Sequence, residues 1–312
     1  MKRMKRTYRR CALVVFAVLV ILMIVGSCLD LQISKLLYPG HESSLGQFFA
    51  AFGELPAFLC FTCAGVLLFL IRGRLRRDWN VLFIIASALL VAFGIVMNIR
   101  EASDNVPALP VWVAALATVF AAAASGVGMF FLTRQCPTKT VLRFILTVVF
   151  VSFVTMVLIN VIKVPWSRPR MRLLVSTGND SYFMPWWQLA GALKQRLVGE
   201  GISPDEFRSF PSGHAACAAC AMLAILLPTL KKQWHDKERV CLAVGAVWTL
   251  LVAVSRIWMG AHYLTDVTMA CLIVLGVSVL GIYLFYFNQR LFRRIWALAA
   301  EPAARQPKQK TR

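Results

Sequence analysis

Polar side chains that could carry out chemistry gather in three short segments of an otherwise apolar chain. The segments are IKVPWSRPR at 162–170, SFPSGHAAC at 209–217 and SRIWMGAHYLTD at 255–266. The chain holds only four histidines, and two of them, His214 and His262, lie in the second and third segments. Two histidines beside several basic residues predict acid–base or nucleophilic chemistry on an anion.

The basic residues of these segments indicate the kind of anion. Arginine presents a planar fork of donors that matches phosphate oxygens, and lysine adds a compact positive charge. We expect three of these residues to converge on one phosphate group: Lys163, Arg170 and Arg256. Arg168 lies two residues before Arg170, and we expect it to support the site without touching the phosphate.

The segment around Pro211 predicts an anion site at the start of a helix. Proline is favoured in the first helical position, Ser212 offers a hydroxyl donor, and Gly213 lets the backbone approach a ligand closely. The free N–H groups and the positive dipole end of the helix would then face the phosphate. Ser212 and Gly213 therefore join the predicted phosphate-binding residues.

The two histidines divide the chemical work in this interpretation. His262 and Asp266 are four residues apart, so they share one face of a helical turn. The aspartate is expected to hold one ring nitrogen and leave the other as a nucleophile, while His214 protonates the departing oxygen. Water would hydrolyse the resulting phosphohistidine. Zinc bound by the same residues is a weaker alternative, because the basic neighbours repel a dication. We therefore expect no metal and no cofactor.

Long apolar runs must position these segments. Hydrophobic residues make up 59% of the 312 residues, and charged residues make up 15%. A helix needs roughly 20 apolar residues to cross a bilayer, and lipid-facing backbone must bond internally. We expect an all-α polytopic membrane bundle with about eight transmembrane helices, at 11–29, 46–71, 80–98, 110–133, 142–163, 214–230, 240–258 and 266–287.

The net charge of +20 predicts how the bundle is oriented. With the N-terminus inside, the inner segments, together with Arg143 at the inner end of the fifth span, hold 24 of the 34 Lys and Arg residues but only 4 of the 14 acids. This asymmetry is the positive-inside pattern, so we expect basic cytoplasmic tails at 1–10 and 289–312. All three polar segments then lie on the outer face. The basic clusters flank spans, which favours contact with membrane lipids over nucleic acid.

One connection is much longer than the others. It covers 164–210 on the predicted outer side, and loops of this length in compact proteins are usually functional. From Trp186 to Val198 the pattern predicts a short amphipathic helix lying at the bilayer surface. Glu54, an acid within the second apolar run, is either a functional residue or a residue exposed to water near the outer end.

The three segments resemble the motifs of the type 2 phosphatidic acid phosphatase (PAP2) superfamily, which are KX6RP, PSGH and SRX5HX3D. The second motif is complete at Pro211–His214, and the third runs complete from Ser255 to Asp266. The first is partial, since Lys163 and Arg170 have the right spacing but Met171 replaces the proline. A register through Arg168 and Pro169 keeps the proline but shortens the spacing, so either arginine could be the motif residue.

The resemblance implies a six-helix core. Residues 134–288 are expected to be the catalytic core with the outer loop 164–210, and residues 11–133 to hold the leading helices together with two additional ones. The resemblance also implies the same roles for the site residues: His262 as nucleophile, His214 as acid, Asp266 as the partner of His262, and a phosphate pocket made by Lys163, Arg170, Ser212, Gly213 and Arg256. The family's membrane-bound lipid phosphatases are the branch that this chain resembles most.

Three functions are compatible with these features. The leading hypothesis is a metal-independent phosphatase in the inner membrane of a bacterium that acts at the outer face on a lipid phosphate or pyrophosphate, such as undecaprenyl pyrophosphate, phosphatidate or phosphatidylglycerol phosphate. A phosphotransferase could use the same phosphohistidine with a lipid acceptor. A transporter or structural membrane protein is the non-enzymatic alternative, and the intact second and third motifs argue against it. The oligomeric state is left open.

Overall fold

A computed structural model of the protein describes residues 2–40 and 43–300. Every regular element in these ranges is helical. The longer helices are α1 (Lys2–Leu37), α3 (Leu55–Ile71), α4 (Asn80–Asn105), α5 (Val111–Thr133), α6 (Thr138–Trp166), α10 (Glu238–Trp258) and α11 (Leu264–Ile282). The shorter ones include α2 (Ser44–Phe52), α7 (Met171–Thr177), α8 (Gly191–Gly199), α9 (Gly213–Ala219), its 3₁₀ continuation η5 (Cys220–Thr229) and α12 (Gln289–Ala299).

Seven helical segments within the described ranges are long and apolar enough to cross a membrane. The eighth predicted span corresponds to α9 and η5, which together form a shorter apolar helix at Gly213–Thr229. The predicted all-α polytopic bundle is therefore confirmed, with seven candidate spans in the described ranges where eight were predicted.

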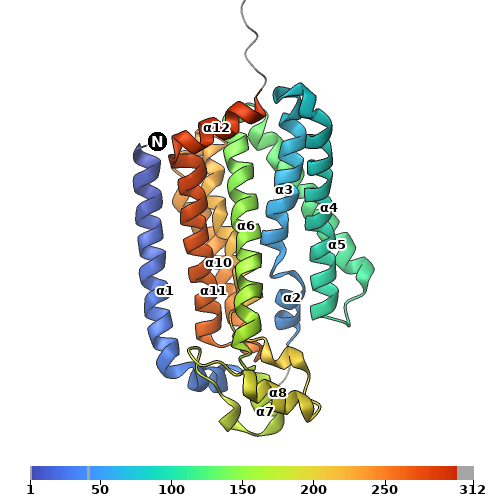
Figure 1. The fold of residues 1–312 in the computed structure, drawn as a ribbon, viewed down its shortest axis with the longest axis vertical. Helices are drawn as coiled ribbons and strands as arrows, with labels where there is room; N and C mark the ends of the chain where they lie inside the picture. Colours follow the sequence, from blue (N-terminus) through green and yellow to red (C-terminus); the bar gives the residue numbers. More distant parts are fainter. Residues whose placement is uncertain (1, 41–42, 301–312) are drawn as a thin grey trace, which may run out of the picture.

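The helices are arranged as a central group with α1 at one edge and the α4–α5 hairpin at the other (Figure 1). In the centre, α9 and η5 pack against α10, α6 packs against α3 and α11, and α1 packs mainly on α11. The α4–α5 hairpin makes its main contacts with α2 and α3. Helices α4 and α5 thus form one side of the bundle.

Close backbone approach attaches this hairpin to the rest of the protein. A Cβ atom on Gly94 of α4 would lie 2.3 Å from Thr62 Oγ1 and 2.6 Å from the Phe58 carbonyl oxygen of α3. Small residues permit such contacts in membranes, where helices associate by van der Waals packing and hydrogen bonds. Within the hairpin, the Asn98 side chain donates a hydrogen bond of 2.7 Å to Thr118 Oγ1.

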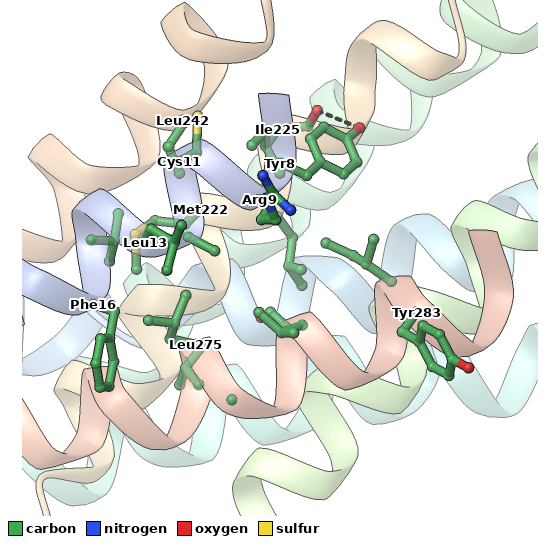
Figure 2. Close-up of a pocket in the computed structure, with 18 of the residues that line it drawn as sticks. Tyr8, Arg9, Cys11, Leu13, Phe16, Met222, Ile225, Leu242, Leu275 and Tyr283 are labelled. Carbon is green, nitrogen blue, oxygen red and sulfur yellow. Dashed lines mark hydrogen bonds between the residues drawn. The ribbon is translucent and has the colours of Figure 1, made fainter. Parts of the chain in front are cut away.

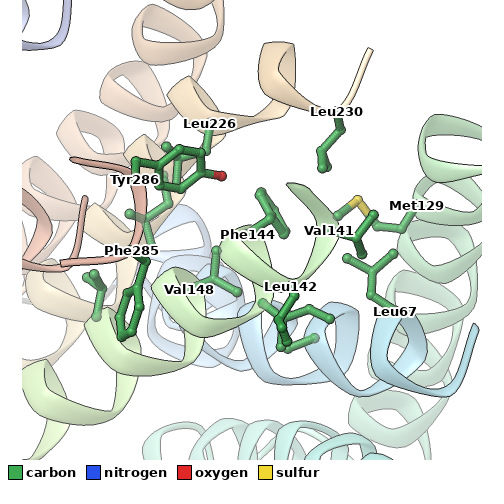
Figure 3. Packing of buried hydrophobic residues seen from close by; sticks show 14 of the residues in the cluster. Leu67, Met129, Val141, Leu142, Phe144, Val148, Leu226, Leu230, Phe285 and Tyr286 are labelled. Atoms are coloured by element: carbon green, nitrogen blue, oxygen red, sulfur yellow. The ribbon is translucent and has the colours of Figure 1, made fainter. Parts of the chain in front are cut away.

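The largest buried apolar cluster occupies the bundle on the side of α12 (Figure 3). Phe144 and Val148 of α6, Leu67 of α3 and Leu226 of η5 interdigitate there, and the cluster also includes Tyr286. The three polar segments lie toward the opposite end of the bundle, where α6 ends (Figure 1).

Both predicted tails are partly helical. Helix α1 begins at Lys2, so the segment predicted as a basic tail at 1–10 continues the first span. Of the predicted tail at 289–312, α12 takes up 289–299, and residues 301–312 lie outside the described ranges. The start of α1 and the helix α12 lie at one end of the bundle, and α7 and α8 lie at the other (Figure 1).

The long connection is largely folded. It contains α7, α8 and two 3₁₀ turns, at Asp180–Tyr182 and Pro204–Phe207. The amphipathic helix predicted from Trp186 to Val198 is shorter in the structure, where α8 begins at Gly191. Trp186 precedes α8, stacks on Phe210 and donates a hydrogen bond of 2.9 Å to Ser27 Oγ, so it fastens the loop to α1.

Candidate active site

The three polar segments converge at the end of the bundle that carries α7 and α8. The end of α6, the start of α9 and the link between α10 and α11 supply them. They surround a cavity of about 150 Å³. Its lining includes four of the predicted site residues, His214, His262, Arg170 and Arg256, and one arginine that the sequence interpretation missed, Arg172.

His262 is held by a backbone carbonyl. Its Nδ1 lies 2.6 Å from the Ser209 carbonyl oxygen, which can only accept a hydrogen bond, so Nδ1 carries the proton and Nε2 keeps its lone pair. Burial lowers the pKa of His262 well below its ordinary value, and the cations Lys163 and Arg170 lower it further. The ring is therefore neutral near pH 7, in the form that can act as a nucleophile.

Asp266 supports His262 indirectly. The distance from His262 Nδ1 to Asp266 Oδ2 is 3.9 Å, which is too long for the direct hydrogen bond expected from the sequence. Asp266 Oδ2 instead accepts hydrogen bonds from Ser209 Oγ at 2.5 Å and from the Tyr263 amide at 2.8 Å. The aspartate thus fixes Ser209, and the Ser209 carbonyl orients the histidine.

Arg168 does not line the cavity. It packs behind the link 259–263 between α10 and α11, which we name the catalytic loop for the candidate nucleophile that it carries. Its side chain is 0% exposed, and it pairs with Asp266 at 2.5 Å and with Asp30 of α1 at 2.9 Å. It also donates to Thr265 Oγ1 and to the Met184 carbonyl oxygen. These partners occupy every nitrogen of the guanidinium group, and the supporting role of Arg168 stays a prediction.

Asp30 is a site residue that the sequence interpretation missed. It accepts a hydrogen bond of 3.0 Å from the Thr265 amide at the start of α11 and pairs with Arg168. An acid near the end of the first apolar run was the available signal, because ionisable residues in spans are rarely without a role.

Arg170 lines the cavity and is paired with an acid of the long connection. Its Nη1 lies 2.6 Å from Asp205 Oδ2. Arg172 makes a similar pair with Glu206 at 2.7 Å. The Nε atom of Arg170 is buried and has no hydrogen-bond partner among the described residues. Arg170 therefore keeps one donor that the described part of the protein does not use.

The remaining predicted phosphate ligands surround the start of α9. Arg256 lines the cavity and donates a hydrogen bond of 2.9 Å to the Gly46 carbonyl oxygen. Ser212 Oγ accepts from the Ala215 amide at 3.3 Å, which makes Ser212 the N-cap of the helix. A Cβ atom on Gly213 would lie 3.5 Å from Lys163 Nζ, so the lysine stands close beside the glycine.

His214 is contacted at both ring nitrogens by the segment between α2 and α3. Its Nε2 lies 3.0 Å from the Ala50 carbonyl oxygen, and its Nδ1 lies 3.1 Å from Glu54 Oε1. Glu54 is buried in the described structure, so of the two readings that the sequence left open, contact with a site residue replaces simple exposure to water.

The α4–α5 connection forms one wall of the cavity. Residues 105–108 line it, opposite the catalytic loop. The α4–α5 hairpin therefore reaches the candidate site. The three motifs and their spacing do not indicate this segment.

Fold and site together define a multi-pass membrane protein with two histidines and three arginines around one cavity. Residues 141–291 of the chain match the family model of the PAP2 superfamily. The resemblance to this superfamily predicted from the motifs is thereby confirmed over these residues.

A curated relative gives a more specific similarity. The chain is 38% identical over 95 residues to phosphatidylglycerophosphatase B of Bacillus subtilis (strain 168), a match that covers 27% of this chain. The match spans 41% of the length of that relative. No solved structure matches the chain.

Proposed function

We propose that the protein is a lipid phosphatase that works through a phosphohistidine on His262. The observation that carries the proposal is the cavity that joins His262, His214 and three arginines at one end of a membrane-spanning bundle. Cations held in a site with little water stabilise the charge that develops on a phosphoryl group. The PAP2 family and the phosphatase-named relative support the same class of activity.

The reaction has two steps. In the first, His262 Nε2 attacks phosphorus, the bond from phosphorus to the lipid oxygen breaks, and that oxygen takes a proton from His214. In the second, water attacks the phosphohistidine, the phosphorus–nitrogen bond breaks, and His214 takes the proton of the water. Arg170, Arg256 and Lys163, with the Ser212–Gly213 backbone, would hold the phosphoryl oxygens. Arg172 adds a fourth cation at the cavity edge.

The substrate is proposed to be a lipid phosphate whose tails stay in the bilayer. A site at the ends of spanning helices suits a headgroup, and the relative's name points to phosphatidylglycerol phosphate. Phosphatidate and undecaprenyl pyrophosphate have the same reacting group. The reaction needs no metal in this scheme, because the arginines and the lysine provide the positive charge.

The central experiment measures phosphate release from a panel of purified lipid phosphates in excess EDTA. We expect turnover of at least one lipid, inhibition by vanadate, and no turnover by His262→Ala on that lipid. Loss of activity in chelator with recovery on adding zinc or magnesium would replace this mechanism by a metal-assisted one. Transfer of the phosphoryl group to a second lipid, with no free phosphate, would identify a phosphotransferase.

The proposed location of the site is the outer face of the membrane. Glu200 follows α8 and is exposed at the site end, and Gln233 lies exposed between η5 and α10 at the other end. In intact cells, an impermeant thiol reagent should label Glu200→Cys and not Gln233→Cys, above the background of the nine native cysteines. The reverse labelling would put the site on the cytoplasmic face.

A further inference from the structure

The break between α2 and α3 brings one short segment against both ring nitrogens of His214. Helix α2 ends at Phe52, and α3 begins at Leu55. Ala50 and Glu54 flank this break, and they contact His214 Nε2 at 3.0 Å and Nδ1 at 3.1 Å. The segment lies outside the matched residues 141–291, so the PAP2 match does not include it.

The partners of the two ring nitrogens indicate where the protons of His214 lie. The Ala50 carbonyl oxygen can only accept, so His214 Nε2 carries a proton. His214 Nδ1 and Glu54 Oε1 lie within ion-pair distance at 3.1 Å, and this contact is favourable when one further proton sits on the histidine or on the carboxyl group. With that proton, the pair holds one proton beyond those of a neutral histidine beside a free carboxylate.

The surroundings explain why a histidine here needs an acidic partner. Lys163 and Arg170 lie near His214, as does Arg256, and positive neighbours disfavour a protonated imidazole. Burial disfavours it as well. A carboxylate in contact with Nδ1 supplies an opposite charge, which stabilises the protonated ring in this buried and cationic environment.

We propose that Glu54 is a positioning residue that keeps His214 protonated, and so able to act as the general acid. The inference rests on the proposed function. During cleavage the Nε2 proton leaves the Ala50 carbonyl oxygen and passes to the lipid oxygen as the bond from that oxygen to phosphorus breaks, while Nδ1 stays against the Glu54 carboxylate. His214 Nε2 then takes the proton of the attacking water, which restores the starting pair.

Two substitutions of Glu54 separate a proton role from a role in packing. Glu54→Gln keeps the shape and loses the ionisable group, and Glu54→Asp is shorter and keeps it. If Glu54 keeps His214 protonated, kcat on dioleoyl phosphatidate should fall ~100-fold in Glu54→Gln, because general acids contribute roughly 10²–10⁴-fold. The loss in Glu54→Asp should be smaller. A packing role requires the opposite order, and that order would overturn the proposal.

Leaving-group chemistry gives an independent readout. The nitrophenolate of p-nitrophenyl phosphate departs without a proton, so Glu54→Gln should lose less than about 3-fold on this substrate. An equal loss on both substrates, or full activity on phosphatidate, would also overturn the proposal. Asp104→Asn is the matched control, since Asp104 is an exposed acid on α4 paired with Arg100. Failure of the wild type on every lipid phosphate would instead reject the proposed function.

A separate observation concerns the opposite end of the bundle. A cavity of about 720 Å³ lies between α1, η5 and α11, at the end where α1 begins (Figures 1 and 2). Apolar side chains such as Phe16, Met222 and Leu275 form its walls. The Tyr8 hydroxyl at its edge already donates to the Ile225 carbonyl oxygen at 3.2 Å. Water finds few partners in such a lining.

Charge indicates what fills this cavity. Two exposed basic residues, Lys5 and Arg9, belong to its lining on the first turns of α1, and no acid does. The geometry points to a bound anionic glycerophospholipid, with one acyl chain in the cavity and its phosphate at Lys5 and Arg9. This lipid would sit in the leaflet opposite the active site, so it would be a resident ligand and not the substrate.

The substitution Gly276→Leu is designed to block the cavity. Gly276 lines the cavity, and a Cβ atom there would meet nothing within 4 Å. A leucine side chain can therefore extend into the cavity from this position. Gly128→Leu on α5 is the matched control, because a Cβ atom there also meets nothing within 4 Å. The measurement is native mass spectrometry after transfer from vesicles of equal phosphatidylglycerol and phosphatidylcholine into mild detergent.

We expect the wild type and Gly128→Leu to retain one phosphatidylglycerol molecule, and Gly276→Leu to retain at least several-fold less. The double variant Lys5→Gln with Arg9→Gln should lose the preference for phosphatidylglycerol over phosphatidylcholine. No retained lipid in the wild type, equal retention by Gly276→Leu, or a wild type without headgroup preference would overturn the assignment.

Discussion

The two sides of the catalytic loop use the same residue types for different purposes. Behind the loop, Arg168 is fully buried and every part of its guanidinium group has a partner, including carboxylates from α1 and α11. On the cavity side of the loop, Arg170 lines the cavity and is paired with a single acid, Asp205 of the long connection. Two arginines that are two residues apart thus meet opposite environments.

This difference distinguishes a buried arginine that stabilises the fold from an arginine that can bind a ligand. A fully paired buried ion contributes to structure, and removing one partner leaves an expensive uncompensated charge. An arginine with spare donors at a cavity can bind an anion that is not part of the protein. Substitutions behind the loop should therefore affect stability first, and substitutions in front should affect turnover first.

The largest expected effect is on the front side, at the proposed nucleophile. His262→Ala should lower kcat on a lipid phosphate on the order of 10³-fold or more, because the covalent step is lost. Phosphate release with protein confirmed as folded by thermal denaturation is the measurement. More than about a tenth of wild-type activity would remove His262 from the role of nucleophile.

The second effect contrasts the two arginines through turnover. Arg170→Lys should lower kcat/KM roughly 100-fold at unchanged Tm, because lysine cannot give the bidentate fork to a phosphate. Arg168→Lys should keep most turnover per folded molecule. A large loss of kcat/KM in Arg168→Lys, with kcat/KM nearly unchanged in Arg170→Lys, would show that Arg168 is the phosphate ligand and that the shorter register from Lys163 to Arg168 is the right one.

The third effect is on the rear side and concerns stability. Lysine at position 168 cannot serve Asp30, Asp266 and the Met184 carbonyl together, so at least one charge-assisted hydrogen bond is lost. We expect a loss of about 1.5–3 kcal/mol in unfolding free energy, seen as a lower Tm in detergent. An Arg168→Lys protein as stable as wild type would mean that the network adds no stability.

The helical bundle and four of the residues that line the cavity could be predicted from the sequence. Long apolar runs indicate a membrane span directly, because lipid imposes both length and internal hydrogen bonding. The motifs indicated that His214, His262 and Arg256 lie together because each lies at the end of an apolar run. The α9–η5 segment was predicted with nearly its observed bounds, but hydropathy does not show that its second half, Cys220–Thr229, is a 3₁₀ helix.

Contacts across the bundle could not be found in this way. Asp30 was missed, and Glu54 was a candidate only through its place in an apolar run. Packing alone brings Asp30 to Arg168 and Glu54 to His214. The Ser209 carbonyl that orients His262 carries no side-chain signal at all. Spacing suggested a direct bond from Asp266 to His262, whereas the aspartate bonds to the loop that holds the histidine.

A smaller effect tests the neutral state of His262 through pH. Burial and the cations Lys163 and Arg170 hold the pKa of His262 well below the ordinary 6.5 that applies when the chain is unfolded. Between these values the unfolded chain binds a proton that the folded one does not, so stability from this group is complete above about pH 6.5 and falls below it. The loss approaches about 1.4 kcal/mol per pH unit.

The measurement is Tm as a function of pH for the wild type and for His262→Gln. The variant should lose stability less steeply between pH 6.5 and pH 5, because glutamine does not titrate. Parallel curves would show that His262 is not the group responsible.

The smallest effect concerns the departure from the first motif at Met171. Residue 171 is the first of α7, and Arg170 before it has φ −81° and ψ 153°, which a following proline tolerates. Proline would stiffen the chain after Arg170 and contribute ~0.4–1 kcal/mol through the unfolded state. Met171 is buried against Leu174 and Tyr263, however, and losing that packing costs about 2 kcal/mol. Met171→Pro should therefore lower Tm slightly and leave kcat/KM within about 3-fold of wild type, or raise it if loose positioning of Arg170 limits the rate. A loss as large as that of Arg170→Lys would mean that the methionine itself positions the arginine.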